Sequence, residues 1–221
     1  MKKVLIVAAH PDDEILGAGG TLLKHRRAGD RLSILFLGDG VTSRDPRAST
    51  KERSQQAKLV ARALGAQQVY MHQLPDNQFD TLPLLDLSKK VEAVVSKVKP
   101  EVIYTNYIND LNIDHRLTCQ AVLTACRPQP GSTVKKILSW ETLSSTEWQA
   151  KDPARLFCPT VYSDITKFID KKLALLRIYK HELRSYPHPR SIEGVKVLAK
   201  YRGLEVGLRY AEAFHLIRSI E

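Results

Sequence analysis

Short apolar runs and amphipathic stretches alternate along most of the chain. The apolar runs predict strands over residues 3–9, 31–37, 68–71, 102–105, 135–140 and 161–165. Stretches with a helical spacing of apolar residues predict helices over residues 14–28, 49–64, 84–98, 115–126, 166–184 and 191–200. Strands that alternate with helices in this way favour an α/β fold with a mostly parallel sheet and helices on both faces.

The length and composition predict one globular domain that covers residues 1–221. Hydrophobic residues make up 43% of the chain, which excludes a disordered protein, and the sequence shows no internal repeat. Two prolines and a glycine in residues 127–133 mark a change in the sequence pattern but not a domain boundary. No apolar run approaches the roughly 20 residues that a membrane span needs, so we expect no membrane association.

The first nine residues join a charged start to a short apolar run, a combination also found in signal peptides. The run is short, however, and it ends in His-Pro-Asp-Asp-Glu rather than in a small-residue cleavage site. A buried first strand is therefore the better interpretation.

The cysteines and the net charge bear on location and partners. Cys119, Cys126 and Cys158 are odd in number and lack CxxC spacing, which fits a reducing cytoplasm, and we expect Cys119 and Cys126 to pack in the core. The formal net charge of +10 fits a nucleic-acid partner, an anionic substrate or a solvated basic surface. Because Lys and Arg are scattered along helices without interleaved aromatic residues, we favour the solvated surface and expect no nucleic-acid partner.

A histidine and an acidic turn follow the first predicted strand. His10 stands at the end of the strand, and Asp12, Asp13 and Glu14 occupy the turn into the first helix. Open parallel sheets bind ligands at the carboxyl ends of their strands, and imidazole and carboxylate are natural zinc ligands. The spacing of His10 and Asp13 lets both point at one ion while Asp12 faces elsewhere.

A further ligand should come from the end of another strand, because catalytic zinc typically takes three protein ligands and keeps one position for water. The loop after residues 102–105 offers Asp110, Asn112, Asp114 and His115. We favour His115, which supplies a second imidazole and enters the following helix.

Two other interpretations of this region are weaker. Carboxylates at the start of a helix gain ~0.3–1 kcal/mol each from the helix dipole, so the turn alone fits simple capping. Capping does not account for the preceding histidine and proline, or for Asn-Ile-Asp-His after a later strand. The run Gly17-Ala18-Gly19-Gly20 lies too far into the helix for a phosphate-binding loop, and we expect it to allow close packing of that helix.

The run Ala-His-Pro-Asp-Asp-Glu at residues 9–14, with Asn-Ile-Asp-His-Arg at residues 112–116, resembles the PIG-L/LmbE-like zinc-dependent deacetylases. Supporting segments lie at residues 51–58, 64–66, 75–77, 201–203 and 211–214. The resemblance implies a Rossmann-like fold and removal of N-acetyl groups from sugars and sugar conjugates. It also implies that His10, Asp13 and His115 ligate zinc, that Asp12 is the general base, and that Arg53 holds the sugar hydroxyls or an attached group.

The chain departs from the family pattern at Asn112, where many members have a histidine that steadies the intermediate or protonates the leaving amine. An amide donates a hydrogen bond, here to the developing oxyanion, but transfers no proton at neutral pH. Either Asp12 returns its proton to the amine, or His188 in the loop of residues 186–191 supplies the missing imidazole; the alternative for His188 is a surface histidine in a rigid turn. Asp114 is expected to orient a partner behind the metal or to cap the helix of His115.

Loops at the same sheet edge supply the expected substrate-binding residues Arg53, Asp76 and Asn77, with Arg44 and the aromatic face of Trp140 as further candidates. The leading hypothesis is a zinc deacetylase of N-acetylglucosamine-type sugars or conjugates, and Fe²⁺ suits the same ligands. The alternatives are an amidase for a larger acyl or thiol-conjugate amide, and a metal-binding or nucleic-acid-binding module without turnover. Family members are often homo-oligomers, and the resemblance extends this expectation to the chain.

Overall fold

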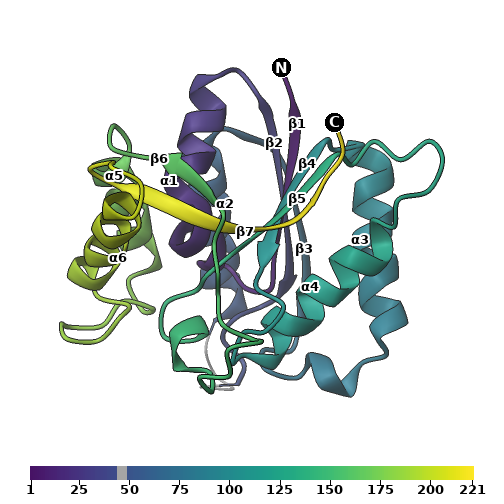
Figure 1. Ribbon diagram of the computed structural model, residues 1–221. Coiled ribbons are helices and arrows are strands. Elements are labelled where there is room, and N and C mark those ends of the chain that lie inside the picture. The colour runs from purple at the N-terminus through teal and green to yellow at the C-terminus, as the bar shows by residue number, and fades with distance from the viewer. Residues whose placement is uncertain (44–48) are drawn as a thin grey trace.

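The computed structural model describes residues 1–43 and 49–221. In this part of the chain, seven strands form one sheet in the order β3-β2-β1-β4-β5-β7-β6 (Figure 1). The strands are β1 (Lys3–Ala8), β2 (Arg31–Gly38), β3 (Ala66–Leu74), β4 (Val102–Asn106), β5 (Lys136–Trp140), β6 (Val161–Asp164) and β7 (Ala211–Ser219). The helices are α1 (Asp13–Arg27), α2 (Thr50–Leu64), α3 (Leu84–Val98), α4 (Ile113–Ala125), α5 (Ile169–Leu176) and α6 (Ile192–Leu204). Three short 3₁₀ helices are η1 (Phe79–Thr81), η2 (Thr146–Trp148) and η3 (Arg177–Tyr179).

The sheet is mostly parallel, which confirms the predicted fold class. Strands β3, β2, β1, β4 and β5 pair in parallel, so their carboxyl ends share one edge. Strand β7 pairs antiparallel with both β5 and β6. This strand was not predicted from the sequence, where the buried Glu212 interrupts its apolar pattern.

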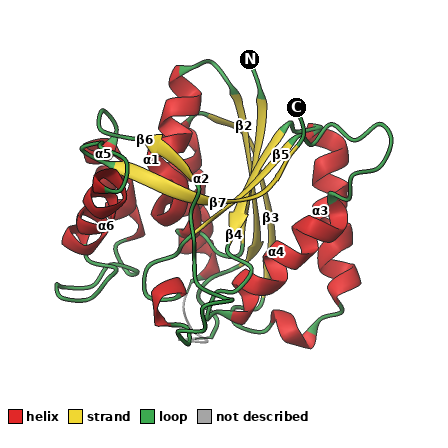
Figure 2. Cartoon of the chain, viewed as in Figure 1, coloured by secondary structure: helices red, strands yellow, loops and turns green. Residues whose placement is uncertain are grey.

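Helices cover both faces of the sheet, as the alternation of elements predicted (Figure 2). Strand β1 shows why: Val4, Ile6 and Ala8 join a core formed with α1, α2, α5 and α6. The intervening Leu5 and Val7, with Ala9 just after the strand, join a second core formed with α3 and α4. Because side chains alternate along a strand, a continuous apolar run serves both faces at once.

The glycine run of α1 allows the close packing that was expected. A Cβ on Gly17 would lie 2.1 Å from the ring of Trp140, and one on Gly20 would lie 2.6 Å from Ile165. Trp140 is therefore 0% exposed, and its expected role as an aromatic face for a sugar is wrong. The space that a side chain would need on α1 is filled by the indole.

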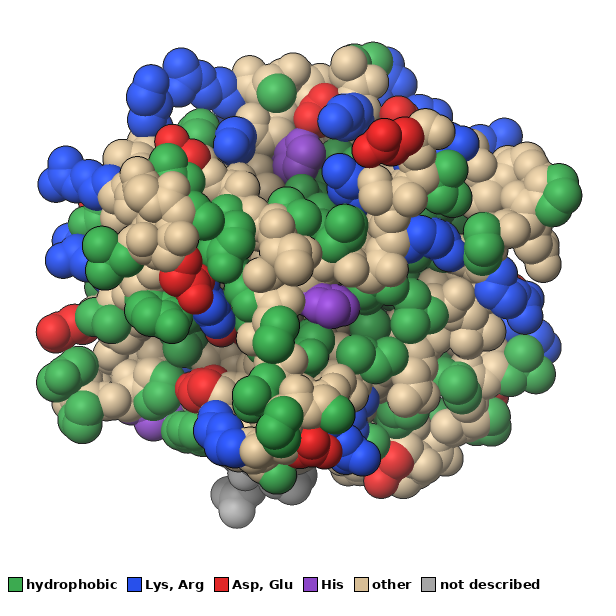
Figure 3. Space-filling view, viewed as in Figure 1, with side chains coloured by type: hydrophobic (Ala, Val, Ile, Leu, Met, Phe, Trp, Pro, Cys, Tyr) green, Lys and Arg blue, Asp and Glu red, His purple; other side chains and the backbone are tan. Residues whose placement is uncertain are grey.

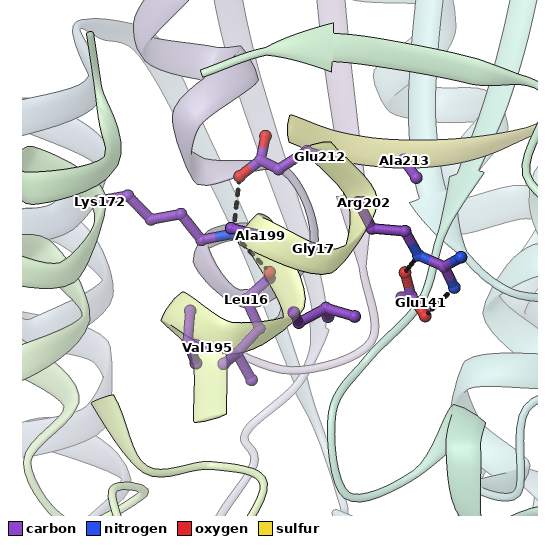
Figure 4. A pocket seen from close by; sticks show the side chains of 10 residues that line it. Leu16, Gly17, Glu141, Lys172, Val195, Ala199, Arg202, Glu212 and Ala213 are labelled. Atoms are coloured by element: carbon purple, nitrogen blue, oxygen red, sulfur yellow. Dashed lines mark hydrogen bonds and ion pairs between the residues drawn. The ribbon is translucent and has the colours of Figure 1, made fainter. Parts of the chain in front are cut away.

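A buried ion pair ties α1 to the antiparallel part of the sheet (Figure 4). The carboxylate of Glu212 accepts from the backbone amides of Gly20 (2.8 Å) and Thr21 (2.7 Å). Lys172 donates to Glu212 (2.7 Å) and to the carbonyl of Leu16 (2.8 Å). The adjoining cavity, about 20 Å³, has room for about one water. The network fixes the helix that begins at the acidic turn.

The predicted helix over residues 166–184 is shorter in the structure. Helix α5 ends at Leu176 and is followed only by η3. The chain then turns so that Tyr179 and Glu182 contact the region of the acidic turn, where they bind Glu14 and Arg53. Tertiary contacts thus override a local pattern that favours a longer helix.

The distribution of charged side chains and the burial of the cysteines match the expectation of a folded core with a basic surface. Lys and Arg side chains are interspersed with other residue types over the face shown in Figure 3. Cys119 and Cys126 are buried, as expected, and Cys158 is exposed. Among the described residues, no helix has both the length and the apolar character that crossing a membrane requires.

Candidate metal centre

His10, Asp13 and His115 converge at the carboxyl edge of the sheet. All three are buried, and one potential ligand atom of each lies within 4.8 Å of the others. Asp13 Oδ2 lies 3.7 Å from Nδ1 of His10 and 3.3 Å from Nε2 of His115. His10 follows β1, Asp13 begins α1 and His115 lies in the first turn of α4, so two strand ends bring the three together.

The turn between β1 and α1 separates the roles of neighbouring carboxylates. Asp12 has φ 121°, a conformation that L-residues other than glycine rarely adopt and that is often found at functional sites. The backbone amide of His10 donates to Asp13 Oδ2 (3.0 Å), and that of Asp12 donates to Glu14 (2.9 Å). Asp13 is thereby directed toward the histidines, whereas Asp12 faces a different set of partners.

The donor set fits a divalent cation. Oδ1 of Asp13 is buried and accepts no hydrogen bond from any described residue, whereas Oδ2 accepts from His10 and from Asn106 (3.1 Å). Burial raises the pKa of Asp13, but the adjacent His115 and His10 hold it well below its usual range. Two imidazoles and one carboxylate with an unpaired oxygen suit Zn²⁺, and Fe²⁺ accepts the same set.

The charges around His115 also favour a bound cation. Burial lowers the pKa of this imidazole, but the carboxylates of Asp13 and Asp110 raise it to about 10. The surroundings of the ring therefore stabilise positive charge strongly enough to outweigh desolvation. A cation bound between these groups would meet the same favourable field.

Carboxylates also lie behind both imidazoles. Nε2 of His10 is 2.9 Å from Asp114 and 3.1 Å from Asp76, and Nδ1 of His115 is 3.1 Å from Asp110. His10, Asp76 and Asp114 form a second group with metal-ligand spacing. Carboxylates in this position commonly fix the orientation of metal-binding histidines. Asp76, Asp110 and Asp114 are thus placed where they could orient the rings.

Asp114 does not cap α4, so that alternative is wrong. The N-cap is Asn112, whose Oδ1 accepts from the backbone amides of Asp114 (2.8 Å) and His115 (3.4 Å). Asp114 instead accepts from the backbone amides of Asn77 (2.7 Å) and Phe79 (3.0 Å). The carboxylate thus joins the loop after β3 to His10. Nδ2 of Asn112 donates to Asn77 Oδ1 (2.8 Å).

Asp12 is held by an ion network that the sequence did not reveal. Its Oδ2 accepts from Arg190 Nη1 at 3.1 Å, and the same nitrogen lies 3.4 Å from Glu182. Glu182 also pairs with Arg53, which donates to the carbonyl of Pro11 (3.3 Å). Burial raises the pKa of Asp12 to about 6, although Arg190 opposes this effect. The only sequence signal for Arg190 was its place in the proline-rich loop of His188.

A polar cavity of about 240 Å³ adjoins this network. It is lined by Asn77, Ser144, Glu182, Arg184, His188 and Arg190. The structure thus brings two residues proposed from the sequence, Asn77 and His188, to one cavity. Arg53 and Asp76 are 4% and 2% exposed and lie behind it, each engaged with a buried partner. Arg44 lies outside the described residues.

The GlcNAc-PI de-N-acetylase (PIG-L) family matches residues 5–126, more than half of the chain. The chain belongs to this family, which confirms the resemblance seen in the motifs. It is 28% identical over 188 residues to the uncharacterized deacetylase YaiS of Escherichia coli (strain K12), covering 81% of this chain and 91% of that protein. It is 26% identical over 235 residues to the diacetylchitobiose deacetylase of Thermococcus kodakarensis, covering 100% and 85%.

Solved structures share the whole fold. The N,N'-diacetylchitobiose deacetylase from Pyrococcus horikoshii superposes with a TM-score of 0.80 at 21% identity. The alignment covers 98% of this chain and 84% of that one. At this identity the likeness establishes the shared fold.

Proposed function

We propose that this protein is a zinc-dependent hydrolase that removes the N-acetyl group from an N-acetylglucosamine-type sugar or sugar conjugate. The observation that carries the proposal is the convergence of His10, Asp13 and His115, in which the buried Oδ1 of Asp13 accepts no hydrogen bond from any described residue. Membership of the family supports the same chemistry. Relatives named as deacetylases of N-acetylated sugars support this substrate class.

In this proposal His10, Asp13 and His115 hold the ion. A bound Zn²⁺ supplies Lewis acidity that polarises the acetamide carbonyl and acidifies a water molecule. The carboxylates behind the two imidazoles keep His10 and His115 oriented toward the ion. Asp76 and Asp114 act on His10, and Asp110 acts on His115.

Asp12 is the general base in this scheme. Its burial makes it a better proton acceptor than a solvated carboxylate, because it raises the pKa to about 6. Arg190 holds Oδ2, so one carboxylate oxygen is fixed while the proton is exchanged at the group. Asp12 then returns the proton to the leaving amine, or His188 donates one in its place.

A backbone hydrogen bond fixes the tautomer of neutral His188. Its Nδ1 accepts from the backbone amide of Arg190 at 3.0 Å, so in the neutral ring Nε2 carries the proton. The Asn112 amide that was considered for the oxyanion donates to Asn77, and it would have to leave this partner to serve the substrate. His188 and Asp12 are therefore the two proton donors to compare.

An acetate-release screen tests the proposal. Metal-stripped protein is reloaded with one equivalent of Zn²⁺ or Fe²⁺ and offered N-acetylated sugars, sugar conjugates, and amides with larger acyl or thiol-conjugate groups. We expect metal-dependent acetate release from sugars, abolished in His10→Ala. Cleavage confined to the larger amides would identify an amidase instead. Metal binding without cleavage of any amide would indicate a module without turnover.

A further inference from the structure

Trp148 is a large aromatic side chain that remains 52% exposed beside the proposed active site. Isolated apolar residues on a surface are ordinary, so exposure by itself indicates nothing. The position distinguishes this residue: its ring lies edge-on to His188, with centroids 5.7 Å apart and planes at 79°. His188 lines the polar cavity of about 240 Å³, so Trp148 stands next to the cavity wall.

The segment that carries Trp148 is anchored to the metal centre. The hydroxyls of Ser145 and Thr146 both donate to Asp110, whose carboxylate lies 3.1 Å from Nδ1 of His115. Glu147 accepts from the backbone amides of Ser144 (2.6 Å) and Ser145 (3.2 Å). The backbone just before Trp148 is therefore anchored next to a proposed metal ligand.

The cavity is small for a complete ligand site. Pockets for small molecules usually measure about 300–1,000 Å³, whereas this one measures about 240 Å³. A single acetamide-bearing sugar ring suits such a volume, so a second ring would have to lie outside it, and Trp148 offers a surface there next to the lining residue His188. A sugar ring has an apolar C–H face and a polar rim, and an exposed indole buries the face while the rim stays in water.

We propose that Trp148 is a stacking platform for a second sugar ring, so that the substrate is at least a disaccharide-sized N-acetylated sugar. This inference rests on the proposed deacetylation. Trp148 acts on binding of the outer ring and touches neither the acetamide nor the base. Its loss should weaken affinity for two-ring substrates and leave the chemical step unchanged.

Kinetics with one-ring and two-ring sugars test the platform in the zinc-loaded enzyme. In Trp148→Ala we expect KM for N,N'-diacetylchitobiose to rise about tenfold, with kcat changed less than about twofold. KM for N-acetylglucosamine should stay at the wild-type value, and Trp148→Phe should recover most of the loss. Tyr201→Ala is the matched control, because Tyr201 is an aromatic residue 54% exposed near the far end of α6. Equal effects on both sugars, or none, would overturn the inference.

Fluorescence separates this inference from the proposed function. The chain has two tryptophans, and Trp140 is 0% exposed, so quenching by acrylamide reports mainly on Trp148. In zinc-loaded Asp12→Asn, N,N'-diacetylchitobiose should protect the indole from quenching, whereas N-acetylglucosamine should not. If the wild type hydrolyses neither sugar, the proposed function fails on these substrates and protection still decides the platform. Absence of protection by the two-ring sugar overturns it.

Discussion

Arg190 donates a hydrogen bond to Asp12 at 3.1 Å although 178 residues separate them in the chain. The proposed base lies in the turn after the first strand, and the arginine lies just before α6. Arg190 also contacts Glu182, which pairs with Arg53. The carboxyl-terminal third of the chain thus completes a site whose proposed metal ligands all come from the first two thirds.

Replacing Arg190 should impair turnover without removing the metal. Arg190→Gln deletes the charge that fixes Asp12, and a misplaced base costs roughly 10–100-fold in kcat. Arg190→Lys should retain part of the rate, because it keeps a charge but not the planar fork of donors. Acetate release and bound metal are measured on each variant, with the exposed Arg177→Gln as control. A wild-type kcat in Arg190→Gln would show that Asp12 needs no such support.

Asp12→Asn should separate metal binding from catalysis. Asp12 is outside the group formed by His10, Asp13 and His115, so the variant should bind metal like the wild type. An amide accepts no proton at neutral pH, and loss of a general base typically costs about 10²–10⁴-fold in rate. Metal analysis and acetate release on the same sample check this. The assignment of the base is wrong if the variant turns over near the wild-type rate.

Asp110→Asn should weaken metal binding although Asp110 is not a proposed ligand. The carboxylate lies 3.1 Å from Nδ1 of His115, and losing a carboxylate that orients a metal ligand usually lowers metal affinity about 10–100-fold. Competition with a chelator measures the affinity, and circular dichroism confirms that the fold survives. The control is Asp152→Asn, an exposed acid that pairs with Arg155. Equal affinities in the two variants would remove Asp110 from the metal site.

Two glycines of α1 should differ in how they tolerate alanine. Gly17→Ala places a Cβ 2.1 Å from Trp140, and overpacking of this kind costs about 1–3 kcal/mol or more. The nearest atoms to a Cβ on Gly19 belong to the side chains of Ile15 and Lys172 at 3.3 Å, so Gly19→Ala meets a much milder contact and gains up to ~1 kcal/mol of helix propensity against it. Urea unfolding should therefore rank Gly19→Ala well above Gly17→Ala in stability. Equal midpoints would mean that Trp140 moves aside without cost.

The sequence predicted those features that depend on residues close to one another in the chain. The buried strand before His10 and the helix after Asp13 place these two residues at the sheet edge. His115 follows from the need for a second imidazole at another strand end. The parallel sheet follows from the alternation of elements, because each strand and helix carries its own hydrophobic period.

The remaining features depend on contacts between distant segments. From the sequence, Asp114 could either cap α4 or orient a histidine ring. Only its contacts with His10 and with the loop after β3 decide between these two roles. Trp140 ends a strand near the site, yet the glycines of α1 let the helix cover it. Arg190 carries no local sign of its partner Asp12, because ion pairs have no sequence period. Strand β7 was missed for a related reason: Glu212 is polar but buried by bonding α1.

The central claim is tested most directly by titrating metal-stripped protein with Zn²⁺ while acetate release from N,N'-diacetylchitobiose and related N-acetylated sugars is recorded. Among the described residues, the two groups with metal-ligand spacing, one of them His10, Asp13 and His115, share His10, so one ion per chain is expected. We predict that activity is absent without metal, rises linearly and reaches its plateau at about one equivalent of ion per chain. His10→Ala should show neither tight binding nor activity. Full activity of the stripped protein, or tight binding that is unchanged in His10→Ala, would contradict the account.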